Sequence, residues 1–377
     1  MADAPAVPTV PEAFSGADHA CMAEALRLAE RGLCTATPNP RVGCVLVKDG
    51  RIVGQGFHAR AGEAHAEVNA LRAAGENARG ATAYVSLEPC SHHGRTPPCA
   101  NALIDAGVSR VVAAMRDPDP RVAGRGLERL AQAGVRAEVG LLAAQAAELN
   151  IGFISRVTRG RPWLRLKTAS SLDGKTALAN GVSQWITGPA ARADVQHWRA
   201  RACAVLTGVG TVLADDPRLT VRLPETTRQP LRVVLDSRLR TPPSANILAG
   251  DGAWLVCGRI ESATDRARRA ALLDAGAQIL ELPGADGRVD LAALLKELGE
   301  RGLNEVHVEA GATLNGALLG AGWVDEWLAY LAPKVLGDPA RGLFALPEYA
   351  EMAQGHAFRL HDLRQLGDDL RLILRPE

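Results

Sequence analysis

A histidine, a glutamate and two cysteines follow one another in an order that could bind and use a metal ion. The chain reads His65-Ala-Glu67, then Pro89-Cys90 and, nine positions later, Cys99. Zinc prefers tetrahedral sites of nitrogen and sulfur, and a catalytic zinc takes three protein ligands and leaves its fourth position to water. One imidazole and two thiolates make such a set. We predict that His65, Cys90 and Cys99 bind Zn2+.

Glu67 adds a proton carrier to this set. Zinc lowers the pKa of its bound water towards neutrality and so yields a hydroxide nucleophile. A carboxylate at this position can take the water proton and pass it to a leaving amine. The order His-x-Glu, Pro-Cys, Cys is typical of hydrolytic nucleobase deaminases, although their two cysteines are usually closer together. The alternative makes His65 a helix-start histidine and both cysteines small core residues. The four features together favour zinc.

The loop between the two cysteines carries His92, His93 and Arg95. An arginine binds phosphate through its planar guanidinium fork, so this loop could receive an anionic group of a substrate. A solvated polar loop accounts for the same residues equally well. Chemistry alone leaves both interpretations open.

Composition narrows the classes of partner. The chain has 377 residues, of which 47% are hydrophobic and 23% charged, and its formal net charge is +1. This balance offers no long-range attraction for nucleic acid or an acidic membrane, and no apolar run approaches the ~18 residues that span a bilayer. Seven cysteines, an odd number, argue for a reducing cytoplasm. Outside the metal set we assign structural roles to Cys21, Cys34, Cys44, Cys203 and Cys257.

The order of the expected elements predicts two α/β domains. Residues 1–16 are rich in Ala and Pro, and we expect a disordered leader there. Strands and helices then alternate, which indicates an α/β layer architecture. A basic, turn-forming segment at 156–162 marks the boundary, giving domains at 17–158 and 159–377. The expected strands are 41–47, 51–57, 81–86, 110–115, 163–168, 204–207, 231–235, 253–257 and 305–308, and the expected helices are 64–74, 101–106, 124–133, 143–153, 189–201, 262–275, 291–300 and 312–321.

The second half says less about its chemistry. It has no G-x-G-x-x-G sequence after a strand, so a Rossmann dinucleotide site is not predicted. Two strand–turn–helix junctions, at 204–211 and 305–311, carry glycine at the turn. A helix N-terminus at such a turn presents free N–H groups and a positive partial charge to a phosphate. Ordinary βα turns have the same pattern, so this half permits a dinucleotide without establishing one.

Longer motifs make the chain similar to a known family. They are TPNPRVGC at 37–44, HAEV at 65–68, SLEPCSHHGRTPPC at 86–99, KTASSLDGK at 167–175, SQWIT at 183–187, TVLADDP at 211–217 and VEAG at 308–311. From about Asp18 to its C-terminus the chain resembles the bifunctional deaminase–reductases of riboflavin biosynthesis, and the long spacing of Cys90 and Cys99 is that family's own. The resemblance implies a cytidine-deaminase-like three-layer α/β/α domain followed by a dihydrofolate-reductase-like α/β domain.

The resemblance also implies two successive reactions. The N-terminal domain would hydrolyse the ring amine of 2,5-diamino-6-(5-phosphoribosylamino)pyrimidin-4(3H)-one. The C-terminal domain would then use NADPH to reduce the ribosyl group of 5-amino-6-(5-phosphoribosylamino)uracil to a ribityl chain. The residues implied in the deaminase pocket are Asn39, His58, His92 and Arg95.

In the second domain the resemblance implies two sets of contacts. The NADPH residues are Ala169, Trp185, Thr211, Asp215, Ser237, Gly311, Ala312, Thr313, Leu314, Asn315, Gly316 and Ala317. The substrate residues are Ser183, Arg199, Leu219, Arg222 and Glu309, and the two arginines suit a phosphate. Lys167 is either a proton donor to the opening ribose ring or a strand lysine at the pocket edge. Arg238 is either the contact for the 2′-phosphate of NADPH or a solvated arginine.

Two rival functions stay open at this point. A nucleoside or nucleobase deaminase with an inactive reductase-like half would not oxidise NADPH when given the deaminated substrate. A zinc-stabilised RNA-binding module is disfavoured by the neutral charge and by Glu67, because a structural zinc site fills its fourth position with another His or Cys. We expect a cytoplasmic homo-oligomer that acts on a small phosphorylated pyrimidine, with no nucleic-acid or membrane partner.

Overall fold

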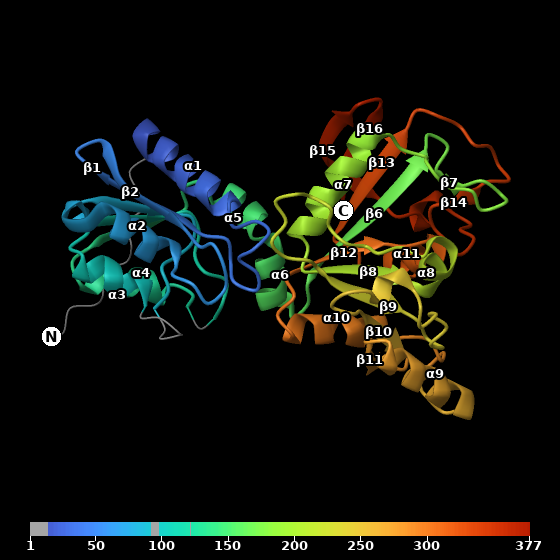
Figure 1. The fold of residues 1–377 in the computed structure, drawn as a ribbon. Helices are drawn as coiled ribbons and strands as arrows, with labels where there is room; N and C mark the ends of the chain where they lie inside the picture. The colour runs from blue at the N-terminus through green and yellow to red at the C-terminus, as the bar shows by residue number, and fades with distance from the viewer. Residues whose placement is uncertain (1–13, 92–97, 121) are drawn as a thin grey trace. The chain divides into compact units, whose positions relative to one another are not determined.

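The computed structural model describes residues 14–91, 98–120 and 122–377 (Figure 1). The chain divides into two compact units, Met1–Thr158 and Arg159–Glu377. No described helix has the length and apolar character needed to cross a bilayer.

A five-stranded mixed sheet forms the centre of the first unit. β1 pairs antiparallel with β2 and β3, whereas β3, β4 and β5 run parallel. In spatial order the strands are β2 (Arg51–Phe57), β1 (Gly43–Lys48), β3 (Thr82–Val85), β4 (Arg110–Ala113) and β5 (Arg136–Val139). The parallel half places the carboxyl ends of β3 and β4 at one edge of the sheet.

Helices cover both faces of this sheet (Figure 1). Successive strand residues point to opposite faces, so Cys44 and Leu46 of β1 join one core and Val45 joins the other. The first core lies under α2 (Ala66–Ala74), the short helix η1 (Gly75–Ala78), α3 (Cys99–Asp105) and α4 (Arg125–Gln132), and the second under α1 (Gly16–Glu30) and α5 (Ala143–Leu149). The expected three-layer α/β/α architecture is confirmed.

Two glycines of β2 seat helix α2 directly on the sheet. A Cβ at Gly56 would lie 2.5 Å from the carbonyl oxygen of Ala66, and one at Gly54 would lie 2.3 Å from that of Ala70. Real Cβ atoms do not approach backbone this closely, so a side chain at either position would push the helix away. The start of α2, which carries His65 and Glu67, therefore depends on β2 for its position.

Two expectations about the ends of the first unit were wrong. Gly16, which we placed in the leader, is the first residue of α1, and Ser15 caps the helix by accepting a hydrogen bond from the Asp18 N–H. The basic segment at 156–162, which we expected to form a turn, begins as helix, because α6 (Ile151–Arg159) extends into it and the chain turns only at Gly160. Arginines favour a helix interior and suit its last turn, so basic character alone was a poor signal for a turn.

A nine-stranded sheet forms the centre of the second unit. The strands β11, β10, β9, β8, β12, β6 and β13 are neighbours in this order and run parallel. β16 pairs antiparallel with β13, and β15 pairs antiparallel with β16. In spatial order they are β11 (Gln278–Glu281), β10 (Trp254–Cys257), β9 (Leu231–Leu235), β8 (Ala204–Gly208), β12 (Glu305–Glu309), β6 (Trp163–Ser171), β13 (Glu326–Ala332), β16 (Asp369–Pro376) and β15 (Phe358–Leu366). A small separate pair joins β7 (Lys175–Ala177) to β14 (Arg341–Gly342).

Helices again cover both faces, which makes this unit α/β as expected. Leu206 and Val233 face the core under α10 (Leu291–Glu300) and α11 (Ala312–Gly320), and Val205 and Val234 face the core under α8 (Val209–Asp215) and α9 (Ala263–Asp274). Helix α7 (Pro189–Arg201) packs against β13 and β16. Two short helices, η2 (Asn246–Leu248) and η3 (Met352–Gln354), lie in connections. The elements that we did not expect are α1, α8, β5, β7, β11, β13, β14, β15 and β16.

The central strands of the second unit carry a buried polar row on the α7 side. Glu305, His307 and Glu309 alternate along β12 with Val306 and Val308 of the apolar core. In the parallel register His307 lies opposite Arg165 of β6, and Glu309 lies opposite Lys167. Charged residues on one face of a buried strand need partners there, and this row becomes part of the second candidate site.

Candidate active sites

Two helix starts deliver two of the three predicted zinc ligands. His65 is the N-cap residue of α2, and Cys99 is the first residue of α3. Cys90 lies in the segment that follows β3. The start of α3 holds this segment, because the Cys99 N–H donates to Cys90 Sγ (3.3 Å) and the Ala100 N–H donates to the Cys90 carbonyl (3.2 Å). The two cysteines are therefore in contact, although they are nine positions apart in the sequence.

The donor atoms fit a zinc ion. His65 Nδ1 lies 3.2 Å from Cys99 Sγ and 3.7 Å from Cys90 Sγ, and all three donor atoms lie within 4.8 Å of one another. Zinc–nitrogen and zinc–sulfur bonds at a tetrahedral angle place such atoms roughly 3.5–3.8 Å apart. Small adjustments would complete the coordination. Among the described residues, this is the one cluster of three or more His, Cys, Asp or Glu side chains with metal-binding geometry.

The local electrostatics suit proton transfer beside a metal. Hydrogen bonds from Cys99 and His65 lower the pKa of the Cys90 thiol, which favours the thiolate form that binds a metal ion. Glu67 is 3% exposed, and burial together with the Cys90 charge raises the pKa of its carboxyl to about 7. A carboxyl with a pKa near the working pH can both accept and release a proton.

Asn39 and His58 form a short chain that reaches the metal cluster. His58 is buried; one ring nitrogen, Nδ1, lies 3.2 Å from the Ala64 carbonyl, and the other, Nε2, lies 3.0 Å from Asn39 Nδ2. Nδ1–H therefore donates to the carbonyl, and Nε2 accepts from the Asn39 amide. The rings of His58 and His65 meet edge to face at 5.2 Å. The structure thus brings Asn39 and His58 to the zinc ligands, whereas His92 and Arg95 lie outside the described residues.

Two buried acids near the cluster escaped the sequence analysis. Asp117 and Asp119 follow β4, whose carboxyl end is next to that of β3, and each is 8% exposed. Burial raises the pKa of Asp117 to about 6, and the charges of Asp119, Glu88 and Cys90 add to the effect, which places this acid near the metal ligands. The signal in the sequence was a pair of acids after a strand parallel to the one that precedes Cys90.

Several of the predicted NADPH residues lie near the carboxyl ends of neighbouring strands of the second unit. Gly208 ends β8 and is the N-cap residue of α8, which contains Thr211 and Asp215. Ser237 follows β9, and Gly311 follows β12 as the N-cap residue of α11. Strands β9, β8 and β12 are parallel neighbours. Their carboxyl ends therefore meet at the edge where open α/β sheets bind ligands.

The residues at 311–317 divide into two groups. Gly311–Leu314 form the cap and first turn of α11, where helix N–H groups are available to a phosphate. Asn315 is 1% exposed and donates to the carbonyls of Ala310 (3.2 Å) and Leu343 (3.3 Å). A Cβ at Gly316 would lie 2.1 Å from the Ala345 carbonyl. Asn315 and Gly316 therefore pack α11 against the 343–345 segment, and the first turn of α11 lies at the carboxyl end of β12.

Two of the predicted substrate residues, Arg199 and Glu309, form an ion pair that is largely buried. Arg199 of α7 donates through Nε and through Nη2 (3.0 Å) to the two carboxylate oxygens of Glu309, and through Nη1 to the Thr220 carbonyl (3.1 Å). Lys167 Nζ lies 3.9 Å from Glu309 Oε2, and His307 Nε2 lies 3.5 Å from Oε1. Burial lowers the pKa of Lys167, although the Glu309 charge opposes this. Arg199 is thus already engaged inside the protein.

Several of the remaining predicted residues are more exposed, whereas Leu219 is buried. The Arg222 N–H donates to Gln196 Oε1 of α7 (3.0 Å), so the segment that carries Leu219 and Arg222 packs beside α7. The Arg222 side chain is exposed. Trp185 is 65% exposed, and the Arg192 guanidinium stacks on its ring at 4.5 Å. Ser183 lies two positions before Trp185 in the same connection. Ala169 is on β6, two positions beyond Lys167, and Arg238 is exposed after β9.

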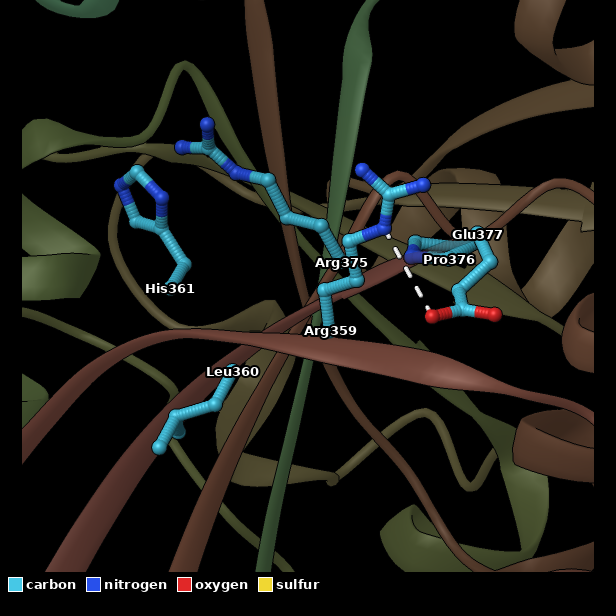
Figure 2. Close-up of a pocket in the computed structure, with 6 residues that line it drawn as sticks. All are labelled: Arg359, Leu360, His361, Arg375, Pro376 and Glu377. Carbon is cyan, nitrogen blue, oxygen red and sulfur yellow. Dashed lines mark ion pairs between the residues drawn. The ribbon is translucent and has the colours of Figure 1, made fainter.

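A surface hollow of the second unit lies away from these residues. Figure 2 shows it on the β15–β16 hairpin, where Arg359 pairs with Glu377 at 3.6 Å. A second cation, Arg375, pairs with Glu326 at 2.8 Å. Its lining residues are Arg359, Leu360, His361, Arg375, Pro376 and Glu377. Both arginines have acidic partners within the chain, so the hollow gives no reason to move the candidate sites.

Comparison with known families divides the chain in the same way. Residues 15–115 match the cytidine and deoxycytidylate deaminase zinc-binding region, and residues 162–372 match the RibD C-terminal domain. The first matched region contains the three predicted zinc ligands, and the second contains the Lys167–Glu309–Arg199 cluster.

Individual relatives match almost the whole chain. The riboflavin biosynthesis protein RibD of Escherichia coli K12 is 52% identical over 370 residues, which cover 95% of this chain and 99% of that protein. A solved structure of Acinetobacter baumannii RibD is 48% identical with a TM-score of 0.89 and covers 96% of this chain and 99% of its own. A Thermotoga maritima structure, described as a diaminohydroxyphosphoribosylaminopyrimidine deaminase/5-amino-6-(5-phosphoribosylamino)uracil reductase, is 32% identical with a TM-score of 0.84 and the same coverage.

Proposed function

The chain belongs to the RibD family of bifunctional riboflavin-biosynthesis deaminase–reductases, and from this premise we propose which of its residues carry out each reaction. It is an enzyme with a zinc-dependent deaminase domain and an NADPH-dependent reductase domain. The alternative function, a deaminase whose reductase-like second half is inactive, is not favoured. The observation that supports the proposal most directly is a carboxylate in each candidate site: Glu67 beside the predicted zinc ligands, and Glu309 paired with Arg199 and close to Lys167.

In the first reaction His65, Cys90 and Cys99 would hold the zinc. When bound, zinc acidifies the water that replaces the ring amine. Glu67 takes a proton from the attacking water and delivers it to the ring amine, which leaves as ammonia when its C–N bond breaks; a pKa of about 7 lets the carboxyl both accept and release this proton. Asn39, fixed by its contact with His58, orients the pyrimidine ring. His92 and Arg95 are proposed to bind the anionic part of the substrate.

In the second reaction a C–O bond of the ribose ring breaks. NADPH, when bound, supplies a hydride to the ribose carbon. Lys167 gives a proton to the ring oxygen, so the products of the step are an open ribityl chain and NADP+. The lowered pKa of Lys167 eases this transfer, and Glu309 holds the ammonium in place at 3.9 Å. Arg199 keeps Glu309 ionised, and Arg222 takes the larger share of the substrate phosphate because its side chain is exposed.

The NADPH contacts are proposed for the carboxyl edge of the sheet. Gly311–Leu314 bind a phosphate at the start of α11. Thr211 lies in the first turn of α8, Asp215 is the last residue of that helix, and Ser237 follows β9. Ala317, Ala169 and Trp185 complete the proposed contacts. Arg238, exposed after β9, is the candidate for the 2′-phosphate.

Product masses test the assignment of residues to reactions. The full-length enzyme is given the diaminopyrimidine phosphate with and without NADPH, beside Glu67→Gln and Lys167→Met. Glu67→Gln should keep its zinc, lose deamination by about 10²–10⁴-fold and still reduce substrate that has already been deaminated. Lys167→Met should deaminate normally and accumulate the aminouracil. A Glu67→Gln enzyme that deaminates within about tenfold of the wild type would remove the proton-carrying role.

The odd number of cysteines supports a cytoplasmic location. Assembly into a homo-oligomer stays a prediction, which the mass of the native enzyme in solution would test.

A further inference from the structure

We propose that Glu88 is a positioning residue of the first active site, which fastens the backbone of Asp117 and of Gly124–Leu127 to the segment that carries Cys90. The inference rests on the proposed deaminase site and adds a residue that touches neither the metal nor the substrate. Glu88 lies two positions before Cys90, and its side chain is 3% exposed.

Backbone N–H groups surround the Glu88 carboxylate. Oε2 accepts hydrogen bonds from the N–H groups of Asp117 (3.1 Å) and Gly124 (2.9 Å), and Oε1 accepts from Gly126 (2.9 Å) and Leu127 (3.4 Å). A carboxylate has about four acceptor positions, so these donors fill its capacity. Burial of an unpaired charge is costly, and here the hydrogen bonds to backbone compensate for it. The carboxylate thus joins two chain segments that are far apart in the sequence.

Gly126 shows how closely the two segments approach. A Cβ at this position would lie 2.0 Å from the Pro89 carbonyl oxygen and 3.2 Å from Glu88 Oε1. The start of α4 therefore rests on the residue directly before Cys90, with no space for a side chain. This contact and the carboxylate fix the same part of the chain from two directions.

The consequence for the site is positional. Cys90 is held in position on one side by the start of α3, whose Cys99 N–H donates to its Sγ (3.3 Å), and on the other side by the Glu88–Pro89 segment. Asp117 donates its N–H to Glu88 and lies near Cys90, so the same carboxylate sets the distance between that acid and the metal ligands. Groups that orient metal ligands typically change metal affinity or activity by ~10–100-fold when removed.

Glu88→Gln in the full-length enzyme tests the inference. The amide keeps the shape but turns an NH2 group towards backbone donors, so the contacts on one side are lost. Zinc release to a chromogenic chelator should be about 10–100-fold faster than in the wild type. Amide hydrogen exchange at Gly124–Leu127 should also be faster, and deaminase kcat should fall. Reduction of the deaminated substrate should not change.

Glu138→Gln is the matched control. Glu138 is a nearly buried carboxylate of the same unit, but its partners are Arg110 and Arg136 on the neighbouring surface. This variant should release zinc at the wild-type rate even if its melting temperature falls. Gly126→Ala attacks the same contact without changing a charge and should also speed zinc release, with Gly16→Ala as its control because a Cβ there meets nothing within 4 Å.

The outcomes separate this inference from the proposed function. If Glu88→Gln releases zinc within about twofold of Glu138→Gln, where removal of an orienting group should give at least tenfold, Glu88 has only a structural role. Gly126→Ala decides by the same criterion if Glu88→Gln does not fold. A wild-type enzyme that binds no zinc would instead contradict the deaminase site itself.

Discussion

Replacement of Arg199 by glutamine should destabilise the second unit strongly. Arg199 is 8% exposed and gives two hydrogen bonds to Glu309 and a third to the Thr220 carbonyl. Removal of one partner of a buried ion pair typically costs about 3–5 kcal/mol, because the other charge stays buried and unpaired. Lys167 at 3.9 Å and His307 at 3.5 Å still face Glu309. We therefore expect a free-energy loss at the lower end, about 3 kcal/mol.

The loss should appear as a shift in melting temperature. For a unit of this size, each kcal/mol moves Tm by about 2–4 °C, so Arg199→Gln should lower it by roughly 6–12 °C. Lys296→Gln is the matched control, since Lys296 and Glu300 form a pair at 3.7 Å with side chains 75% and 59% exposed. Exposed pairs contribute at most about 1 kcal/mol.

The pH dependence of this difference has a definite sign. Burial opposes ionisation of Glu309, but the Arg199 charge outweighs it and holds the pKa well below its ordinary value of 4.5. A carboxyl with a lowered folded-state pKa adds stability above its unfolded pKa, and this stability is lost as the pH falls further. The gap between wild type and Arg199→Gln should therefore be constant from pH 8 to about 5 and narrow below about 4.5.

Tryptophan fluorescence isolates the relevant unit. All six tryptophans, at 163, 185, 198, 254, 323 and 327, lie in the second half of the sequence. A thermal melt followed at this signal reports the second unit without interference from the first. The reasoning is refuted if Arg199→Gln melts within about 2 °C of Lys296→Gln at pH 7, a difference worth at most about 1 kcal/mol.

Three further predictions concern the metal, the phosphates and the division of the chain. Cys99→Ser should bind less zinc per chain than the wild type by metal analysis, and full occupancy would remove Cys99 from the ligand set. In steady-state kinetics with NADPH and with NADH, Arg222→Ala should raise the substrate KM and leave the NADPH KM nearly unchanged. Arg238→Ala should raise the NADPH KM, leave the substrate KM nearly unchanged and narrow the preference for NADPH over NADH. An Arg222→Ala enzyme that loses only NADPH affinity would mean that the two ligands are assigned the wrong way round. Expression of residues 1–158 should give soluble deaminase, whereas an insoluble fragment would argue against this boundary.

The elements that could be predicted were those with a strong local pattern. Helices α7 and α10 and strands β2 and β9 have the expected bounds, because each is a periodic or apolar run between clear turn residues. The expected helix at 143–153 is instead α5 and α6, separated at Asn150. The Asn150 amide accepts from the Arg41 N–H (2.8 Å) and donates to the Arg41 carbonyl (3.0 Å). A contact over such a sequence distance leaves no trace in the local pattern.

The C-terminal strands were missed for a related reason. Most residues of β15 are exposed, so no apolar run marks it, and its strand conformation depends on the antiparallel pairing with β16. Strand formation of this kind comes from a neighbour and not from intrinsic preference.

The candidate sites divide in the same way between local and distant information. The order of His65, Glu67, Cys90 and Cys99 was readable because ligand type and spacing carry the chemistry. The pairing of Arg199 with Glu309 was not, since α7 and β12 meet only in the folded unit. Glu88 stands within the motif at 86–99, but its role could not be predicted, because its partners are backbone N–H groups, which every residue except proline has.

The glycines of β2 affect which mutations abolish the deaminase activity. A Cβ at Gly56 would lie 2.5 Å from the carbonyl of Ala66, the residue between His65 and Glu67. A single nucleotide change that replaces Gly56 by a residue with a side chain would therefore displace His65 and Glu67 together, although Gly56 is neither a predicted metal ligand nor the proton carrier. In a collection of randomly mutated genes selected for loss of deamination, β2 should thus contribute inactive alleles beside the motif positions, and these alleles should keep their reductase activity.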